Sequence, residues 1–573
     1  MKNKILVIFI LSVFKNILAQ NPIYYPAFPI MIDSARTPFQ KSGIPLIADL
    51  DKDSQQEIIF FSVDYNGVAS PLGRLYVIRS DGSIFPNFPK GFNEVILCIA
   101  SGDVNGDGYL DIALRLTNSI DVIDRNGNHL SGFPKNYSDG DATTLKPISL
   151  YDFENDDKLE LIASKKNELI VFNFDGTVKA GWPRYIAGIM QTNPAIGDLN
   201  GDGYGEIIAA TLKRDNSGII DSSALRIYKR NGENFSKNWP LYSDSSYYNW
   251  GASPSIIINK NFVDSTYILM STLKYDNGSG ISKNRLTKYN MSGEIVDRGY
   301  NSVLNGLGTL IIGDIDRDGK PEFANGAQGN PYLTLYSNNL IKLTGWPNEG
   351  VGEYEATPLI GRLTNSNTLN VIDNSWLAND PIGYGYIHAY ENNGTPLPWS
   401  PLRPIGLVRA ISLSDLNNDG SVEIIATSSK TYNETYLHVW TIPGIPFTHD
   451  DFPWPQNGHD RYRTNQYGFV PPDEPVGIQL IGSIVPEKYV LYQNFPNPFN
   501  PTTSIKFEIK NSSFIELKIF DALGREVENF INKRLKPGTY SLTFDGSKYT
   551  SGVYFYRLTT VDFIEAKKML LVK

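Results

Sequence analysis

The segment DLNGDGYGEIIAAT, Asp198–Thr211, combines a loop rich in oxygen-bearing side chains with an apolar run. Oxygen-bearing side chains stand at the first, third, fifth and ninth positions of its loop, Asp198–Glu206, and an apolar run follows at once. Alternate residues of such a loop point inward, so four side-chain oxygens and the carbonyl at the seventh position can surround one hard cation. Glycine at the sixth position permits the tight turn. The segment therefore predicts a cation-binding loop that leads directly into a β-strand.

The same pattern recurs along the chain. The six loops are Asp49–Glu57, Asp103–Asp111, Asp152–Glu160, Asp198–Glu206, Asp314–Glu322 and Asp415–Glu423. Successive loops begin 54, 49, 46, 116 and 101 residues apart, and the last two intervals are about twice the others. Two further repeats, at Pro254–Met270 and Thr357–Ile372, have therefore lost the carboxylates.

A second feature recurs with the loops: a strand-like run, a turn and an aromatic–Pro pair, as in LIVFNFDGTVKAGWP from Leu169. Its copies begin at Leu75, Ile120, Leu169, Leu225, Leu286, Leu333, Ile387 and Leu437. A unit of roughly fifty residues with about four short strands has the size of a propeller blade, and a ring of blades removes exposed sheet edges. We therefore predict an all-β chain with a β-propeller of seven or eight blades, the count favouring eight. An open β-solenoid is the alternative, although its repeats are usually much shorter.

The segment YPAFP, Tyr25–Pro29, resembles the end of a unit but precedes the first one, so we expect the N-terminus to complete the last blade. The run WPQNGHDRYRTN, Trp454–Asn465, closes the array, and the predicted propeller covers residues 20–466. A Pro-rich linker is expected at 467–488. Residues 489–573 alternate apolar and polar side chains, which predicts a small immunoglobulin-like β-sandwich.

Calcium fits the loops best, because Mg²⁺ prefers fewer protein ligands and Zn²⁺ would want His or Cys. The predicted ligands are Asp49, Asp51, Asp53, Glu57, Asp103, Asn105, Asp107, Asp111, Asp152, Glu154, Asp156, Glu160, Asp198, Asn200, Asp202, Glu206, Asp314, Asp316, Asp318, Glu322, Asp415, Asn417, Asp419 and Glu423. Two loops are weaker, since Ser54 and Asp157 replace the sixth-position glycine. An acidic turn without metal is the alternative for every loop. An EF-hand is excluded, because its last acid stands at position 12 between helices.

The N-terminus predicts secretion. Lys2 and Lys4 precede the apolar run Ile5–Phe14, and cleavage after Ala19 would remove a signal peptide of residues 1–19. No other segment could span a bilayer, so the mature chain is expected to lack a transmembrane segment. Cys98 is the single cysteine and cannot form a disulfide within the chain. We therefore expect about six structural Ca²⁺ ions to stabilise the fold in place of disulfides.

The loops and the strands that follow them resemble the FG-GAP (VCBS-type) repeats of integrin alpha-chain propellers, over about Ile23 to Asn465. The resemblance implies that each calcium loop joins the first and second strands of a blade, on the lower face. Seven blades are usual in that family. Under this resemblance, connections between second and third strands open on the opposite face.

Residues 489–573 resemble the sorting domain of type IX secretion, on the segments YQNFPNPFNPTTSIKFEI from Tyr492, LKIFDALGREV from Leu517 and GTYSLTFDGSKYTSGVYFYRL from Gly538. The resemblance implies passage through the periplasm, recognition by the outer-membrane translocon and processing by a sortase-like peptidase. The expected destination is the outer cell surface or the medium.

Two classes of function stay open. Aromatic residues in the variable connections, Tyr247, Trp250, Tyr275, Trp376 and Tyr384, suit a glycan or protein ligand and favour a binding or adhesion module. A calcium-dependent polysaccharide lyase or another carbohydrate-active propeller enzyme is the alternative. The sequence contains no HExxH, GxSxG or phosphate-loop motif, so no catalytic residue is assigned. The net charge of −9 argues against a nucleic-acid partner.

Overall fold

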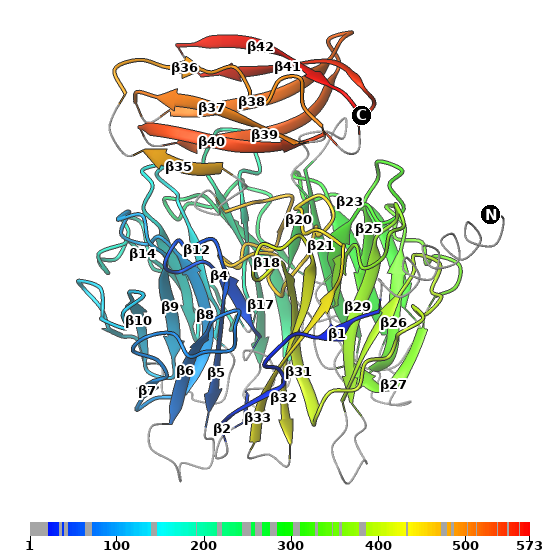
Figure 1. The fold of residues 1–573 in the computed structure, drawn as a ribbon. Coiled ribbons are helices and arrows are strands. Elements are labelled where there is room, and N and C mark those ends of the chain that lie inside the picture. Colours follow the sequence, from blue (N-terminus) through cyan, green and yellow to red (C-terminus); the bar gives the residue numbers. More distant parts are fainter. Residues whose placement is uncertain are drawn as a thin grey trace, which may run out of the picture. The chain divides into compact units, whose positions relative to one another are not determined.

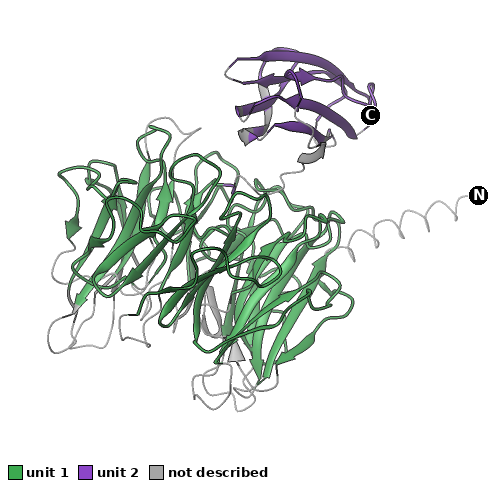
Figure 2. Ribbon diagram, turned by 90° about the vertical axis from the view of Figure 1, so that its left-hand side faces the viewer, with its two compact units in different colours: residues 1–469 green, residues 470–573 purple. Residues whose placement is uncertain are grey.

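The computed structural model describes residues 21–573 apart from the following residues: 34–36, 39–43, 64–71, 139–145, 191, 215–219, 243–253, 258–265, 275–282, 302–309, 327–329, 347, 355–357, 377–384, 431–433, 472–477, 483–485, 501, 512, 536, 547–548 and 561. Regular structure in the described residues is β-strand throughout. These residues contain no helix long and apolar enough to cross a membrane. The chain divides into two compact units, Met1–Phe469 and Val470–Lys573 (Figure 2), each of which is described by itself.

The first unit is a series of antiparallel meanders (Figure 1). Four of its sheets are β3 (Thr37–Pro38), β4 (Leu46–Ala48), β5 (Glu57–Val63), β6 (Gly73–Ile78) and β7 (Lys90–Phe92); β8 (Ile96–Gly102), β9 (Asp111–Leu116), β10 (Ser119–Ile123) and β11 (Lys135–Asn136); β12 (Ile148–Tyr151), β13 (Glu160–Lys165), β14 (Glu168–Phe172) and β15 (Arg184–Tyr185); and β16 (Ala195–Gly197), β17 (Glu206–Arg214), β18 (Ile220–Tyr228) and β19 (Leu241–Tyr242).

Three further sheets follow. The first contains β20 (Ser255–Ile257), β21 (Tyr267–Lys274), β22 (Lys283–Tyr289), β23 (Ile295–Asn301) and β34 (Gln466–Tyr467). The second contains β24 (Ile311–Gly313), β25 (Glu322–Asn325), β26 (Asn330–Tyr336), β27 (Asn348–Tyr354), β28 (Leu359–Gly361), β29 (Asn370–Trp376) and β30 (Gly385–Tyr390). The third contains β31 (Leu407–Ser414), β32 (Val422–Lys430) and β33 (Glu434–Ile442), together with β1 (Ile23–Tyr24) and β2 (Ile30–Asp33). In the seven-stranded sheet, two meanders are joined where β27 pairs with β29.

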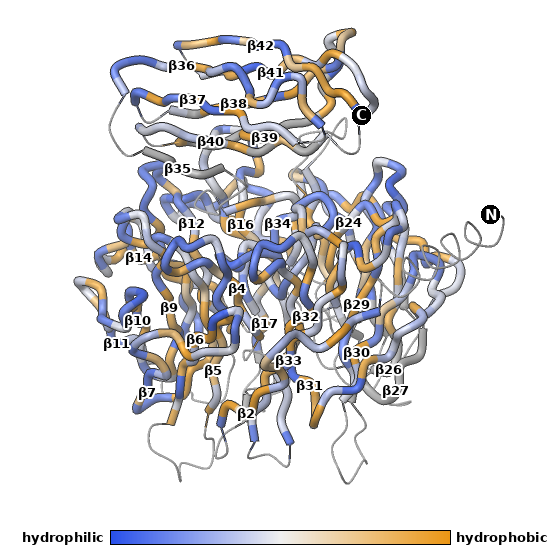
Figure 3. The backbone as a smooth tube through the Cα atoms, in the orientation of Figure 1, coloured by the Kyte–Doolittle hydropathy of each residue, from blue (hydrophilic) through white to orange (hydrophobic). Residues whose placement is uncertain are grey.

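Consecutive sheets share hydrophobic cores. One core joins the β4–β7 sheet to the β8–β11 sheet, and the next cores continue this order along the chain. Ile47 and Phe60 of the β4–β7 sheet then pack with Leu416 and Val439 of the last sheet. The sheets therefore follow one another in a cyclic order, which makes the unit propeller-like. Figure 3 shows the apolar residues concentrated along the strands.

The N-terminal segment completes the last sheet, as the position of YPAFP predicts. Ile23 pairs with Thr441, and Ile30 pairs with Leu437. Both strands lie on β33, so the sheet contains the first and the last strands of the meander series. Ser412 of this sheet also donates a hydrogen bond of 2.6 Å to the carbonyl of Pro45, beside β4.

A closing segment, Trp454–Gln466, runs along the first strands of the meanders. Its backbone carbonyls accept hydrogen bonds in the order Trp454 from Ile360, Pro455 from Leu413, Arg461 from Ser101, Tyr462 from Leu150, Thr464 from Ile196 and Asn465 from Ile256. These six donors belong to six different meanders. The closing segment therefore links sheets that are far apart along the chain, and the expectation that WPQNGHDRYRTN closes the array is confirmed.

The second unit has two four-stranded antiparallel sheets. One sheet has the order β35 (Ile478–Gly482), β40 (Gly538–Asp545), β37 (Thr502–Ile509), β36 (Val490–Leu491), and the other has the order β39 (Glu526–Leu535), β38 (Ser513–Asp521), β41 (Gly552–Thr559), β42 (Ile564–Leu571). Side chains from both sheets form one core, which includes Phe507, Leu517 and Tyr556. Within the expected linker, Ile478–Gly482 forms a strand that pairs with β40.

Candidate calcium sites and the sorting domain

All six carboxylate loops join the first and second strands of a meander, as the resemblance implies. In each loop, the backbone N–H of the second residue donates to the ninth-position carboxylate. The pairs are Leu50 with Glu57 (2.8 Å), Val104 with Asp111 (3.1 Å), Phe153 with Glu160 (2.9 Å), Leu199 with Glu206 (2.9 Å), Ile315 with Glu322 (2.8 Å) and Leu416 with Glu423 (2.8 Å). This recurring bond holds the carboxylate, which begins or nearly begins the second strand, against the loop.

A second recurring bond fixes the first-position aspartate, which accepts the N–H of the sixth residue. The donors and acceptors are Ser54 and Asp49 (3.0 Å), Gly108 and Asp103 (2.7 Å), Asp157 and Asp152 (2.9 Å), Gly203 and Asp198 (2.8 Å), Gly319 and Asp314 (3.1 Å), and Gly420 and Asp415 (2.9 Å). Ser54 and Asp157 have φ values of 71° and 64°, in the left-handed region that the glycines occupy elsewhere. The two loops without this glycine therefore make the same turn.

Carboxylate oxygens converge in these loops. The ligand atoms of Asp49, Asp51 and Asp53 lie within 4.8 Å of one another, as do those of Asp314, Asp316 and Glu322. Oxygens that surround one Ca²⁺ at about 2.3–2.6 Å lie at most about 5 Å apart, so both groups fit this ion. Oδ1 of Asp51 and Oδ1 of Asp314 are buried and accept no hydrogen bond. A buried carboxylate oxygen without a donor is costly unless a cation satisfies it.

Burial also acts on the ninth-position carboxylates. It raises the pKa of Glu57, Asp111, Glu322 and Glu423 to about 8, and that of Glu206 to about 7. The neighbouring first- and fifth-position carboxylates add to these shifts. A bound cation would favour the charged form of each group. The loops therefore have the donor set and the electrostatic environment of a hard-cation site.

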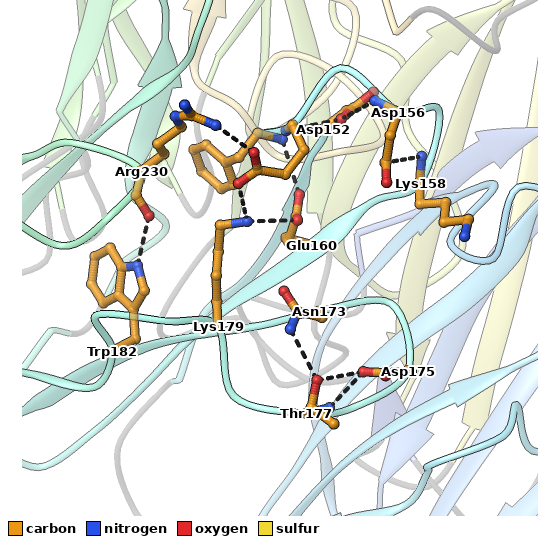
Figure 4. Close-up of polar contacts among 12 residues, drawn as sticks. Asp152, Asp156, Lys158, Glu160, Asn173, Asp175, Thr177, Lys179, Trp182 and Arg230 are labelled. Carbon is orange, nitrogen blue, oxygen red and sulfur yellow. Dashed lines mark hydrogen bonds and ion pairs between the residues drawn. The ribbon is translucent and has the colours of Figure 1, made fainter.

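The Asp152 loop, Asp152–Glu160, differs from the other five because a lysine enters it (Figure 4). Nζ of Lys179 lies 2.9 Å from Oε1 of Glu160 and 2.5 Å from Oε1 of Glu154. Arg230 contacts the other oxygen of Glu154. Burial lowers the pKa of Lys179, but hydrogen bonds to the two glutamates outweigh it and raise the pKa overall.

The seventh repeat keeps the loop but not the carboxylates, as predicted. Its ninth position is Asn370, whose Oδ1 accepts the N–H of Leu363 at 2.9 Å, which is the same bond without a charge. Arg362 stands at the first position and pairs with Asp451 at 2.9 Å. The corresponding loop of the fifth repeat, 258–265, lies outside the described residues.

Most of the predicted ligand-binding aromatics lie outside the described residues: Tyr247, Trp250, Tyr275 and Tyr384. Trp376 ends β29, and its side chain is not among those described. These five residues therefore remain predictions.

Tryptophans of the aromatic–Pro pairs have a structural role. Trp182, Trp239 and Trp346 are buried, and each indole N–H donates to a backbone carbonyl in the turn of the next meander. For Trp182 the acceptor is the carbonyl of Arg230, at 2.9 Å. The repeated tryptophan position therefore ties neighbouring meanders together.

The histidines that the structure describes in strands and turns bind to neighbouring polar groups. His388 and His438 contact Ser375 and Ser428 at 2.8 and 2.9 Å. His459, in the closing segment, lies 3.0 Å from Asp460. This placement gives His459 a structural role in the closing segment. Lys179 was not singled out from the sequence, although it is a charged residue at a position where the other repeats have apolar ones.

The second unit is identified by comparison with known families. Residues 493–573 match the family model described as the secretion system C-terminal sorting domain. The second unit contains a sorting domain. A sorting domain of this type implies that the chain interacts with the type IX secretion system and is exported to the cell surface or secreted. No curated protein matches the chain by sequence.

Many solved structures are similar to this chain, and three of them illustrate the low identity. BBS1N in complex with ARL6DN is 12% identical with a TM-score of 0.39, and the match covers 73% of this chain and 97% of that chain. Drosophila Semaphorin 1b, extracellular domains 1–2, is 8% identical with a TM-score of 0.33, over 62% and 88% of the two chains. PorZ, a surface component of the type IX secretion system of Porphyromonas gingivalis, is 11% identical with a TM-score of 0.20, over 92% and 81%. We draw no functional conclusion from these likenesses.

Proposed function

We propose that this protein is an exported, calcium-stabilised β-propeller of eight FG-GAP (VCBS-type) blades that acts as a binding or adhesion module for a glycan or a surface protein. The buried oxygens of Asp51 and Asp314, which accept no hydrogen bond within converging carboxylate groups, carry the calcium part of the proposal. The sorting domain supports the destination of the chain.

The blade count is supported by the meanders. Seven sheets are present in the described part of the first unit, and one of them contains two meanders joined by the pairing of β27 with β29. The eight recurring runs predicted from Leu75 onward fall on β6, β10, β14, β18, β22, β26, β30 and β33. Each of these strands is the third described strand of its meander when β1, β2 and β3 are set aside.

The calcium loops stabilise the blades, and the ligand-binding surface lies at the opposite end of the strands. In an antiparallel meander, the connection between the first and second strands and the connection between the second and third strands lie at opposite ends. All six loops are of the first kind, so one end of the meanders is committed to them. The second kind of connection differs in length from blade to blade and includes the predicted positions Tyr275 and Tyr384, while Tyr247 and Trp250 lie in the connection from β19 to β20. Variable connections of this kind support a recognition surface there.

A binding assay with and without calcium tests this proposal. Purified protein is applied to a glycan array and to outer-membrane fractions in 1 mM Ca²⁺ or in EGTA, and the supernatant is monitored for unsaturated sugar products. Retention in Ca²⁺ without product formation is the expected result. Ultraviolet-absorbing products would instead show lyase activity, and equal binding of all surfaces by a denatured control would contradict specific recognition.

A further inference from the structure

Lys179 occupies a position that is apolar in the other repeats where the structure describes it. The residue at this position follows the turn after the third strand, and its backbone N–H donates to a carbonyl of that strand. The donors and acceptors are Phe85 and Val77, Leu130 and Val122, Lys179 and Val171, Phe235 and Ile227, Leu343 and Leu335, and Leu397 and Ala389. Five of these six donors are Phe or Leu. Lys179 is therefore a local exception in an otherwise apolar position.

The exception coincides with a second one in the adjacent loop. The third position of the other five loops is Asp or Asn, whereas the Asp152 loop has the longer Glu154. Glu154 reaches Lys179 with one oxygen and Arg230 with the other. Both exceptions thus belong to one cluster of charges, which Figure 4 shows around Glu160.

Lys179 cannot leave this cluster easily, because its side chain is buried. Its exposed fraction is 8%, and Glu160 beside it is 6% exposed. Oε2 of Glu160 accepts the N–H of Phe153, and Oε1 accepts Lys179. Among the described residues, no other ninth-position carboxylate forms an ion pair. A Ca²⁺ ion on Oε1 of Glu160, at about 2.3–2.6 Å, would lie within about 5.5 Å of the ammonium group and would be repelled by it.

We infer that the ammonium group of Lys179 replaces calcium in the Asp152 loop, so this loop is neutralised from within the protein and takes no ion. This inference rests on the proposed function, in which the carboxylate loops bind calcium, and it restricts calcium to the other five loops. The cation of the Asp152 loop is part of the chain, and the loop keeps its shape in the absence of calcium.

The replacement also joins two meanders. Arg230, which pairs with Glu154, lies beyond β18 in the next meander, and Asn155 donates to the carbonyl of Gly203 at 2.9 Å. The carbonyl of Arg230 accepts the indole N–H of Trp182. The boundary between the β12–β15 and β16–β19 sheets is therefore held by contacts that need no metal.

Counting bound ions by native mass spectrometry tests the inference. At saturating Ca²⁺, the protein should bind five ions, and the Lys179→Leu variant, which carries the leucine found at the equivalent position of other repeats, should bind six. Phe235→Leu changes the equivalent position of the next meander and should leave the count at five.

Two variants that keep Lys179 test the same point independently of how Lys179→Leu folds. Asp152→Asn should leave the count unchanged, whereas Asp198→Asn should remove one ion. Six ions in the unaltered protein, with one lost in Asp152→Asn, would overturn the inference and leave the proposed function intact. No bound calcium in either the unaltered protein or Lys179→Leu would refute both.

Discussion

Removal of calcium should destabilise the propeller by an amount that follows from the number of loops that can hold the ion. Five loops have a carboxylate set without an internal ammonium group, those that begin at Asp49, Asp103, Asp198, Asp314 and Asp415. With dissociation constants of about 10⁻⁴–10⁻³ M, typical of extracellular calcium modules, each loop contributes about 0.4–1.4 kcal/mol at 1 mM Ca²⁺. The five loops together therefore contribute about 2–7 kcal/mol, which is comparable with the net stability of a whole domain.

The assay is calorimetric unfolding of the purified protein in 1 mM Ca²⁺ and in EGTA with 1 mM Mg²⁺. The propeller transition should move to lower temperature in EGTA, while the transition of the sorting domain should stay in place. Asp316→Ala removes one ligand from the Asp314 loop and should reduce the calcium-dependent part of the stability by one loop's share. Thr364→Ala, at the same position of the seventh repeat, is the matched control and should leave it unchanged.

Two results would refute the reasoning. A propeller transition that EGTA does not move would show that the loops are acidic turns that hold no structural ion. An equal loss of calcium dependence in Asp316→Ala and Thr364→Ala would show that the effect does not depend on the carboxylates of the loop.

Three further outcomes are expected. Trp182→Phe should lower the free energy of unfolding by about 1 kcal/mol through the lost hydrogen bond to the carbonyl of Arg230, measured by urea denaturation, and an unchanged midpoint would contradict the role assigned to the indole. Burial lowers the pKa of His388 and His438 to about 4, so both are neutral in the folded protein at neutral pH, and the stability of the folded state is undiminished above about pH 6.5. As the pH falls from 6.5 towards 4, the unfolded state takes up protons that the folded state does not, which lowers the free energy of unfolding by at most about 3 kcal/mol for each histidine. His438→Gln should therefore flatten the pH dependence of stability between pH 6.5 and 4, and a slope as steep as before would argue against this explanation. Deletion of residues 489–573 should leave the protein in the periplasm, detected by cell fractionation, and normal surface display of the truncated chain would show that the sorting domain is dispensable.

The repeat architecture could be read from the sequence because it depends on local signals. Each carboxylate loop, strand and turn lies within one repeat, so its spacing predicts the repeat and the strand that follows each loop, whereas the place of the loop between the first two strands was implied by the resemblance to FG-GAP repeats. The completion of the last sheet by Ile23–Tyr24 was also predictable, since an orphan unit end has to pair with an incomplete unit. The strand Ile478–Gly482 was not predicted, because it is one short run between Pro-rich stretches and its partner, β40, lies about 60 residues further on.

The Lys179 cluster could not be predicted with the same ease. Lys179 is 19 residues from Glu160, and Arg230 is 76 residues from Glu154, so the cluster depends on how two turns and a loop meet in space. One signal was available in the sequence: a charged residue stands at a position where the other repeats have apolar residues. A search of the repeats for such exceptions would have singled out Lys179 before the structure did.

The closing segment sets the order in which the first unit can mature. The contacts within most meanders join residues close in sequence, whereas Arg463 of the closing segment is 314 residues from its partner Ser149 and 364 residues from its partner Ile99. Most individual sheets can therefore form during synthesis of the chain. The closing segment, however, cannot pair with their first strands until residues 454–466 have been synthesised. During that interval the sheets depend on their mutual packing alone. A chaperone or protease that binds the incomplete chain would therefore encounter folded sheets that are not yet linked by the closing segment.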